Sequence, residues 1–308
     1  MNSTRPNRSA RRLALAAMAG GMATILGATA ASAAPFATQA SAQALYVGVL
    51  DPAVVIDTGT ETAQNDGSED SVTASEEPLL TVLDGQDVVT AGALGEVAVA
   101  NNDGTSAACA GVVGEGGSVD VGDPLDCGIP GTDPVEIQLA DVVGAVSASI
   151  QADAITATCT GAADGTVTGD AVLTNAQLVV SAPPLVNVEV DLASDVAPNT
   201  NALDVLSPTV AALLSPLVDV TLNEQVPLDP EESGDGYYGG LSVTAISVDA
   251  LDGGLADVDL GTVTCGPSAD LALVPAVPLA GLPIALGTLA VAGGGAALVT
   301  RRRQRPTS

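Results

Sequence analysis

The sequence predicts an all-β protein, an antiparallel β-sandwich with one short helix. Apolar and polar residues alternate with period two in many segments, as in Val135–Leu139, which is typical of strands with one solvated face. Gly- and Asp-rich turns separate these segments at the spacing of a sandwich. The apolar content is 47%, mostly Ala, Val and Leu, which is sufficient for a core of small side chains.

Residues 1–33 predict a signal peptide. A positive segment from Arg5 to Arg12 precedes the apolar run Leu13–Gly27, and small residues lead up to Ala33, after which we place the cleavage. The alternative is an N-terminal anchor helix. The pair Arg11-Arg12 leaves twin-arginine export open beside the general route. Residues 34–43 are then expected to form a linker.

The first half of the predicted ectodomain, which spans residues 44–270, is irregular. Residues 58–77 are polar and acidic without periodicity, so we expect an exposed or disordered loop there. Residues 101–132, rich in Gly and Asp, predict a second loop excursion that carries two cysteines. The strands expected in this half are Ala44–Leu50, Val54–Ile56, Pro78–Leu83, Asp87–Ala91 and Glu96–Ala100.

The second half alternates cleanly and contains the helix. The strands expected first are Val135–Leu139, Val142–Ile150, Ile155–Cys159, Val186–Leu192 and Val218–Asn223. Ser207-Pro208 predicts a helix start, leucines follow at helical spacing, and Pro216 ends the helix.

A closing hairpin is expected from Leu241–Leu251 and Asp257–Cys265. Its alternation changes phase at Ala245–Ile246 and near Gly261, which predicts β-bulges.

The C-terminus predicts a membrane anchor. Leu279–Val299 carries no charge and is long enough to cross a bilayer as a helix. Arg301, Arg302 and Arg303 follow, and basic residues stay cytoplasmic, so residues 300–308 form a cytoplasmic tail and the ectodomain is extracellular. A buried globular helix is the alternative. A sortase signal is disfavoured because residues 282–286 lack the Thr-Gly of its motif.

Charge is distributed with a strong asymmetry. All eight basic residues lie near the two ends, and no Lys, Arg or His occurs between Leu13 and Thr300, where all 37 acidic residues fall. This excludes nucleic-acid binding, which needs phosphate neutralisation. It also excludes Ser-His-Asp, Cys-His and Schiff-base catalysis for want of a base. We expect no cofactor, and only weak, diffuse association with cations.

The four cysteines predict disulfides, because an exported chain meets an oxidising compartment. Three pairings are possible, and we favour Cys109–Cys127 with Cys159–Cys265. The first closes a local loop, and the second ties the ends of two strands. Metal binding is disfavoured because the chain has no CxxC spacing and no His.

Two motifs offer alternative functions. Asp57-Thr58-Gly59 after an apolar strand is similar to the catalytic turn of aspartic proteases, which needs two carboxylates, so a homodimer would have to supply the second. An ordinary polar turn explains the same residues. The acidic loops Asp66–Asp70 and Asp229–Asp235 suggest a Ca²⁺-dependent adhesion module, although neither has EF-hand spacing and a solvated loop explains both.

The segments ASIQADAITATCTG, DGTVTGDAVLTNAQLVV, VDVTLNEQV, GGLSVTAISVDAL and DLGTVTCGP, in this order, resemble the choice-of-anchor P surface proteins of actinobacteria. The resemblance covers Leu79–Pro267 and is most specific at Leu222–Gln225 and Thr264–Gly266. It implies the Cys159–Cys265 pairing and a cell-surface location, and it implies no activity.

Together these features predict a non-enzymatic, exported surface protein of a Gram-positive actinobacterium. Its expected partners are the cell membrane, through the C-terminal helix, and a surface protein that the sequence does not identify.

Overall fold

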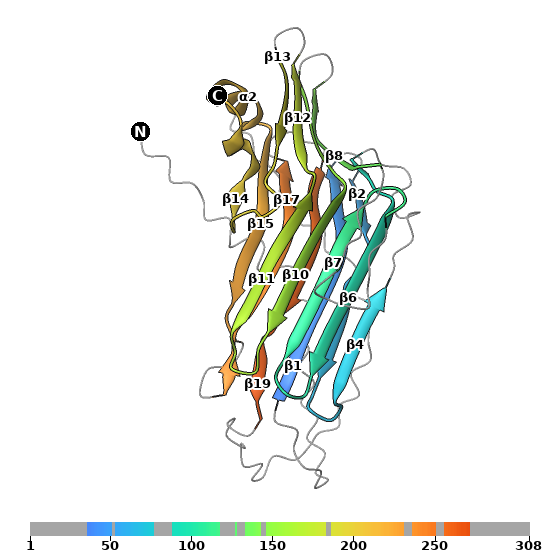
Figure 1. The fold of residues 1–308 in the computed structure, drawn as a ribbon, viewed down its shortest axis with the longest axis vertical. Coiled ribbons are helices and arrows are strands. Elements are labelled where there is room, and N and C mark those ends of the chain that lie inside the picture. Colours follow the sequence, from blue (N-terminus) through green and yellow to red (C-terminus); the bar gives the residue numbers. More distant parts are fainter. Residues whose placement is uncertain are drawn as a thin grey trace, which may run out of the picture. The chain divides into compact units, whose positions relative to one another are not determined.

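The computed structural model describes residues 36–50, 53–76, 88–117, 127, 133–142, 146–182, 186–230, 236–250 and 256–271. All of them belong to one compact unit, residues 1–274. Antiparallel strands make up most of this described part, together with one 3₁₀ turn and one short α-helix (Figure 1). For the described residues, the prediction of an all-β fold with one short α-helix is confirmed.

The first sheet is organised around β1 (Phe36–Leu50), which pairs with β18 along one side and with β2 and β3 end to end along the other. The remaining strands continue outward from β18, and two short strands extend the end of β1. The other members are β14 (Thr200–Asn201), β15 (Val218–Leu228), β17 (Gly240–Ala250), β18 (Ala256–Cys265), β2 (Ala53–Asp57), β3 (Glu61–Asn65), β19 (Ser268–Asp270) and β16 (Tyr237–Tyr238).

The second sheet packs face to face on the first, with β6 and β7 over β1 and with β10 and β11 over β17 (Figure 1). One apolar cluster fills the space between the sheets, including Leu45, Ile155 and Leu260 beside many alanines. This is the sandwich core of small side chains that the composition predicted. The strand order is β11 (Val167–Thr174), β10 (Ala154–Gly161), β7 (Ser106–Val113), β6 (Ala93–Asn101) and β4 (Ser71–Glu76).

A third sheet continues the strands of the second. The chain passes from β9 to β10 through Asp153, and from β11 to β12 through Asn175, whose side-chain amide donates to Asp153 Oδ2 at 2.6 Å. Asn175 has a φ of 50°, so the strands turn at this joint. The strand order is β13 (Val186–Asp191), β12 (Gln177–Ala182), β9 (Val146–Ala152), β8 (Val135–Val142) and β5 (Val89–Thr90).

The helical segment lies between β14 and β15 and has two parts. A 3₁₀ turn, η2 (Ala202–Val205), precedes α2 (Pro208–Leu214), which begins at Pro208 as predicted. Ser207 occupies the N-cap position but makes no capping bond with its side chain. Leu203, Leu206, Val210 and Leu214 are buried in the main core, as the predicted apolar face requires. Leu213, which was expected on the same face, is exposed.

The prediction of three irregular segments is wrong in part, because each of them contains residues of a strand. Residues 34–43 include the start of β1 at Phe36; the predicted loop 58–77 contains β3 and β4; and the predicted loop 101–132 contains β7. Polar or alanine-rich sequences form these strands because they pair with β1 and β6, and tertiary pairing outweighs intrinsic propensity in sheets. The predicted strand Pro78–Leu83 lies outside the described residues.

The phase change in the closing hairpin is present, but β-bulges do not cause it. Four residues lie side by side across the first sheet and are left out of the regular ladder: Ala44, Gly261, Ala245 and Asn223, here called the break row. The register is the same on both sides of this row, so no strand holds an extra residue, as a bulge requires. Instead φ is positive at Asn223 (48°) and Gly261 (59°), which turns the strands over.

Candidate functional site

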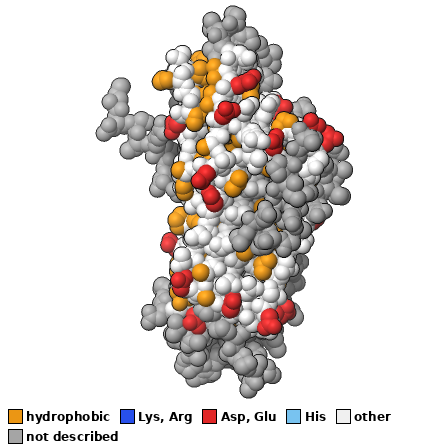
Figure 2. All heavy atoms as spheres, in the orientation of Figure 1, with side chains coloured by type: hydrophobic (Ala, Val, Ile, Leu, Met, Phe, Trp, Pro, Cys, Tyr) orange, Lys and Arg blue, Asp and Glu red, His pale blue; other side chains and the backbone are white. Residues whose placement is uncertain are grey.

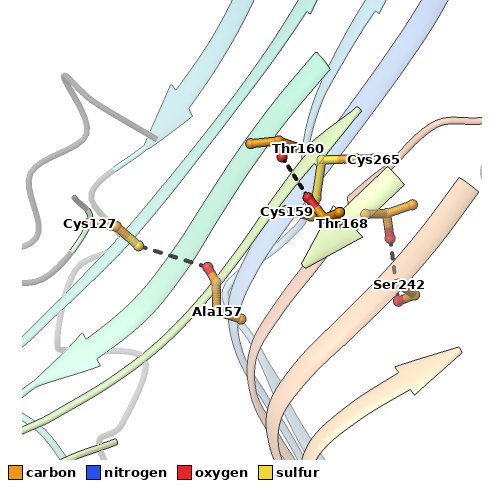
Figure 3. Close-up of a disulfide and its surroundings, with 8 residues drawn as sticks. Cys127, Ala157, Cys159, Thr160, Thr168, Ser242 and Cys265 are labelled. Atoms are coloured by element: carbon orange, nitrogen blue, oxygen red, sulfur yellow. Dashed lines mark hydrogen bonds between the residues drawn. A yellow bond between two sulfur atoms is a disulfide. The ribbon is translucent and has the colours of Figure 1, made fainter. Parts of the chain in front are cut away.

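The disulfide Cys159–Cys265 joins the two sheets of the sandwich. Cys159 is on β10 and Cys265 is at the end of β18, and both are buried (Figure 3). Their Cα atoms are 5.9 Å apart across a sequence separation of 106 residues. On chain entropy alone, a bridge that closes a loop of this length stabilises the folded state by about 4–5 kcal/mol. The favoured pairing is therefore confirmed.

The second disulfide, Cys109–Cys127, lies on the other face of the second sheet. Cys109 is on β7, with Val97 of β6 beside it in a small apolar cluster that Cys127 covers. Cys127 Sγ also lies 3.9 Å from the carbonyl oxygen of Ala157 (Figure 3). This bridge holds Cys127 against the apolar side chains of Val97 and Val99. Because all four cysteines are bridged, none is a thiolate ligand or nucleophile.

The Asp-Thr-Gly turn lies in the gap between β2 and β3, beside the break row. Asp57 is exposed, and its Oδ1 accepts hydrogen bonds from Gly59 N (2.8 Å) and from the side-chain amide of Gln43 (2.6 Å). Thr58 Oγ1 accepts from Leu45 N and donates to Leu45 O, both at 3.1 Å. These contacts match the polar-turn interpretation, in which the motif closes the gap along β1. The dimeric protease stays a prediction.

Glu96 on β6 points into the sandwich and is 0% exposed. Its Oε1 accepts a hydrogen bond from Ala44 N at 2.7 Å, and its Oε2 has no hydrogen-bond partner among the described residues. Burial raises the pKa of Glu96 to about 7, although the nearby Thr58 hydroxyl and the hydrogen bond from Ala44 N lower it. The break row explains the contact, because it leaves Ala44 out of the ladder and Glu96 provides an acceptor there.

Two further carboxyl groups accompany Glu96 at this edge. Glu76 is directly opposite Glu96 in the β4–β6 register, and Glu61 begins β3. Burial raises the pKa of Glu61, as do its hydrogen bond with Glu76 and the negative charge of Glu76. The charges of Glu61 and Glu76 in turn raise the pKa of Glu96. We call Glu61, Glu76 and Glu96 the glutamate cluster.

Sequence reasoning missed the glutamate cluster, although one signal was present. The segment ALGEVAVA places Glu96 in the same alternation phase as Ala98 and Ala100, which both face the core. A charged residue in the buried phase of an apolar strand is unusual, and it could have identified Glu96 as a buried carboxyl group.

The opposite edge of the sandwich is closed by side-chain amides. Asn223 Nδ2 donates to Val196 O (2.6 Å) and to Asp170 Oδ1 (3.0 Å), and Gln225 Nε2 donates to Gly169 O (2.8 Å). Asn199 Oδ1 accepts from Gln225 N at 3.0 Å. These residues, Asn199, Asn223 and Gln225, form the amide network, which ties β15 of the first sheet to β11 of the second. The segment Leu222–Gln225, singled out in the sequence, therefore has a structural role.

The acidic loop Asp66–Asp70 is organised by its own hydrogen bonds. Asp66 Oδ1 accepts from Ser68 N at 3.0 Å, and its hydrogen bonds with Ser68 lower the pKa of Asp66. Asn102 Nδ2 donates to Asp70 Oδ1 at 3.3 Å. Within the described residues no group of three or more acidic, His or Cys side chains is placed to hold a metal ion. Most of the second acidic loop, Asp229–Asp235, lies outside them.

The exposed surface carries acidic groups throughout. On the face shown in Figure 2, carboxylates are scattered among uncharged side chains rather than gathered in one place. No basic side chain can neutralise them, because the chain between Leu13 and Thr300 contains none. The carboxylates therefore depend on solvent, backbone N–H groups and side-chain amides.

The predicted ends of the chain are outside the described part. This applies to the cleavage position Ala33, the span Leu279–Val299, and the anchor residues Arg301, Arg302 and Arg303. In the part that is described, no helix is long and apolar enough to span a membrane.

Comparison with models of protein families, with characterised proteins and with solved structures finds no match for this chain. The membership in the choice-of-anchor P family stays a prediction.

Proposed function

We propose that this protein is an exported, non-catalytic surface protein. In this proposal a disulfide-stapled acidic β-sandwich is presented outside the cell, and the C-terminal apolar segment holds it to the membrane. The observation that carries the proposal is the buried bridge Cys159–Cys265, which joins the two sheets. A bridge that links the halves of a core is expected where disulfides persist, which is outside the reducing cytosol.

The charge of the sandwich supports the same function. The formal net charge is −29, and the described residues include no cation to offset the carboxylates. A strongly anionic domain stays soluble and is repelled by other anionic surfaces. Next to an anionic cell wall, such a domain would remain at a distance from the wall and present its outer surface to the medium.

The two ends supply the means of export and retention. A basic segment followed by an apolar run and small residues ending at Ala33 would direct secretion. The uncharged segment Leu279–Val299 followed by Arg301–Arg303 would stop translocation with the sandwich outside.

Fractionation of the source cells combined with protease treatment of intact cells tests the proposal. We expect the protein in the membrane fraction, with Ala34 as its first residue, and we expect external protease to remove the sandwich while leaving the tail beyond Arg303 protected. Recovery of the intact chain from the cytosol, with its first 33 residues attached, would contradict the proposal.

A further inference from the structure

Glu96 is a carboxyl group that the sandwich buries without a cation beside it. Its side chain is 0% exposed, and the chain from Leu13 to Thr300 contains no Lys, Arg or His. Burying an isolated carboxylate is strongly unfavourable, so such a group takes up a proton instead. Because Oε1 already accepts from Ala44 N and Oε2 has no partner among the described residues, the proton belongs on Oε2.

Every element packed around Glu96 offers either neutral groups or further acids. The neighbours are Ala44 N–H from β1, the Thr58 hydroxyl from the turn after β2, Ala110 opposite on β7, Glu61 from β3 and Glu76 from β4. The nearby Asp57 carboxylate accepts from Gln43 and Gly59 instead. Ionised Glu96 would therefore meet two other negative groups and no compensating charge.

We propose that the glutamate cluster is a proton-operated lock on one edge of the sandwich. With Glu96 protonated, its side chain bridges β6 of the second sheet to the break row of β1 through Ala44 N–H. Loss of the proton places an uncompensated charge between the sheets, and this edge, formed by β3 and β4, loosens so that water can reach the carboxylate.

The sign of the effect follows from proton linkage. The closed edge binds the proton more tightly than the open edge, where Glu96 would have its ordinary pKa of about 4.3. The lock is therefore strongest below that pH and weakens as pH rises, until Glu96 is ionised in the closed state near pH 7. Above that pH no further weakening is expected from this group.

The direct test is a titration of the full oxidised chain, in non-ionic detergent, with ¹³C-labelled glutamate observed by NMR. We expect one side-chain carboxyl resonance with a midpoint near pH 7 that is lost in Glu96→Gln. Glu61→Gln should lower this midpoint because it removes a negative neighbour, whereas the exposed Glu189→Gln on β13 should leave it unchanged. A Glu96 midpoint in the ordinary range of about 4–5 would overturn the proposal.

Amide hydrogen exchange then tests the lock itself. After correction for the intrinsic rate, protection of the Ala44 amide in the wild type should fall by up to tenfold per pH unit between about pH 5 and 7 and then level off. The same amide in Glu96→Gln should show no such fall. Constant protection in the wild type, with Glu96 titrating near pH 7, would rule out the lock. If Glu96→Gln fails to fold, Glu61→Gln provides the comparison, with its fall displaced to lower pH.

Discussion

The two edges of the sandwich provide hydrogen-bond partners for the break row with different chemistry. At one edge, the amide network surrounds the break-row residue Asn223, and every amide hydrogen bond described there has a protein acceptor. At the other edge, the break-row residue Ala44 meets Glu96, which has one bonded oxygen and one without a hydrogen-bond partner among the described residues. In a chain that has no basic side chain between its ends, carboxyl groups that are shielded from solvent must be satisfied by N–H or O–H donors or must hold a proton.

This difference between amide and carboxyl groups predicts which edge responds to pH. The amide network joins β15 to β11 through the side-chain amides of Asn223 and Gln225, which do not titrate. The glutamate cluster joins β6 to β1 through a group whose pKa is raised to about 7 by burial. The first edge should therefore hold at all moderate pH values, and the second should hold best in mild acid.

The largest expected effect comes from the bridge Cys159–Cys265, which joins the two sheets. Replacing both Cys159 and Cys265 by Ala should lower the free energy of unfolding by about 4–5 kcal/mol, because the bridge closes a long loop. Urea unfolding of the full chain measures this. The bridge Cys109–Cys127 closes a shorter loop, with a sequence separation of 18 residues. Replacing both of its cysteines by Ala should therefore lower the free energy of unfolding by only about 3 kcal/mol. Equal losses of unfolding free energy in the two double variants would contradict the larger stabilising role of the bridge between the sheets.

Removing the amide network should have the next largest effect. Asn223→Gly deletes the buried amide but suits the positive φ at this position, so the loss of about 1–3 kcal/mol reports the hydrogen bonds to Val196 and Asp170. The control is Asn175→Gly, which also has a positive φ but bonds Asp153 at an exposed joint, and it should change stability little. A loss of stability in Asn223→Gly that grows between pH 5 and 7 would contradict the expectation that only the edge with the glutamate cluster responds to pH.

A smaller effect is expected at the turn beside the glutamate cluster. Thr58→Val keeps the shape of the side chain and removes the hydroxyl that bonds the Leu45 backbone, which should cost about 1 kcal/mol. It should also raise the pKa of Glu96, because Thr58 lowers it in the wild type. Exposed Thr60→Val serves as the control, and both variants can be compared by urea unfolding and by the glutamate titration. A lower Glu96 midpoint in Thr58→Val would contradict this assignment.

The smallest expected effect comes from the repulsion among the carboxylates of the chain. The melting temperature of the full chain should rise by a few degrees as salt increases from low values, because screening weakens the repulsion among its carboxylates. Calorimetry in dilute buffer and at moderate salt checks this. A melting temperature that does not change over this range would show that self-repulsion has no measurable role in stability.

The parts of the fold that the sequence could predict are those where one strand face is buried. From Val135 onward the alternation identified most strands and the helix, because burial repeats every second or every third to fourth residue. It could not identify β3 and β4, whose sequences ETAQN and SVTASE are polar, because these edge strands are stabilised by pairing with distant β1 and β6.

The candidate site shows the same limit. The phase change at Gly261 could be read from the sequence, but its cause could not, because the break row forms only when four strands lie side by side. The burial of Glu96 could have been inferred from its alternation phase, but its contacts could not, because they come from β1, β3 and β4, which the sequence places far from it. The disulfide pairing could be favoured over its two alternatives because Cys109–Cys127 closes a local loop and Cys159–Cys265 ties the ends of two alternating segments.

In the proposed function, the sandwich matures outside the cytosol with both bridges formed. The measurement that tests it most directly is thiol labelling of the protein in its own cells, with a maleimide added before lysis and the peptides then separated without reduction. We predict no labelled cysteine and two cross-linked peptide pairs, one joining Cys109 to Cys127 and one joining Cys159 to Cys265. Labelled Cys159 or Cys265 in the full-length chain would contradict maturation outside the cytosol.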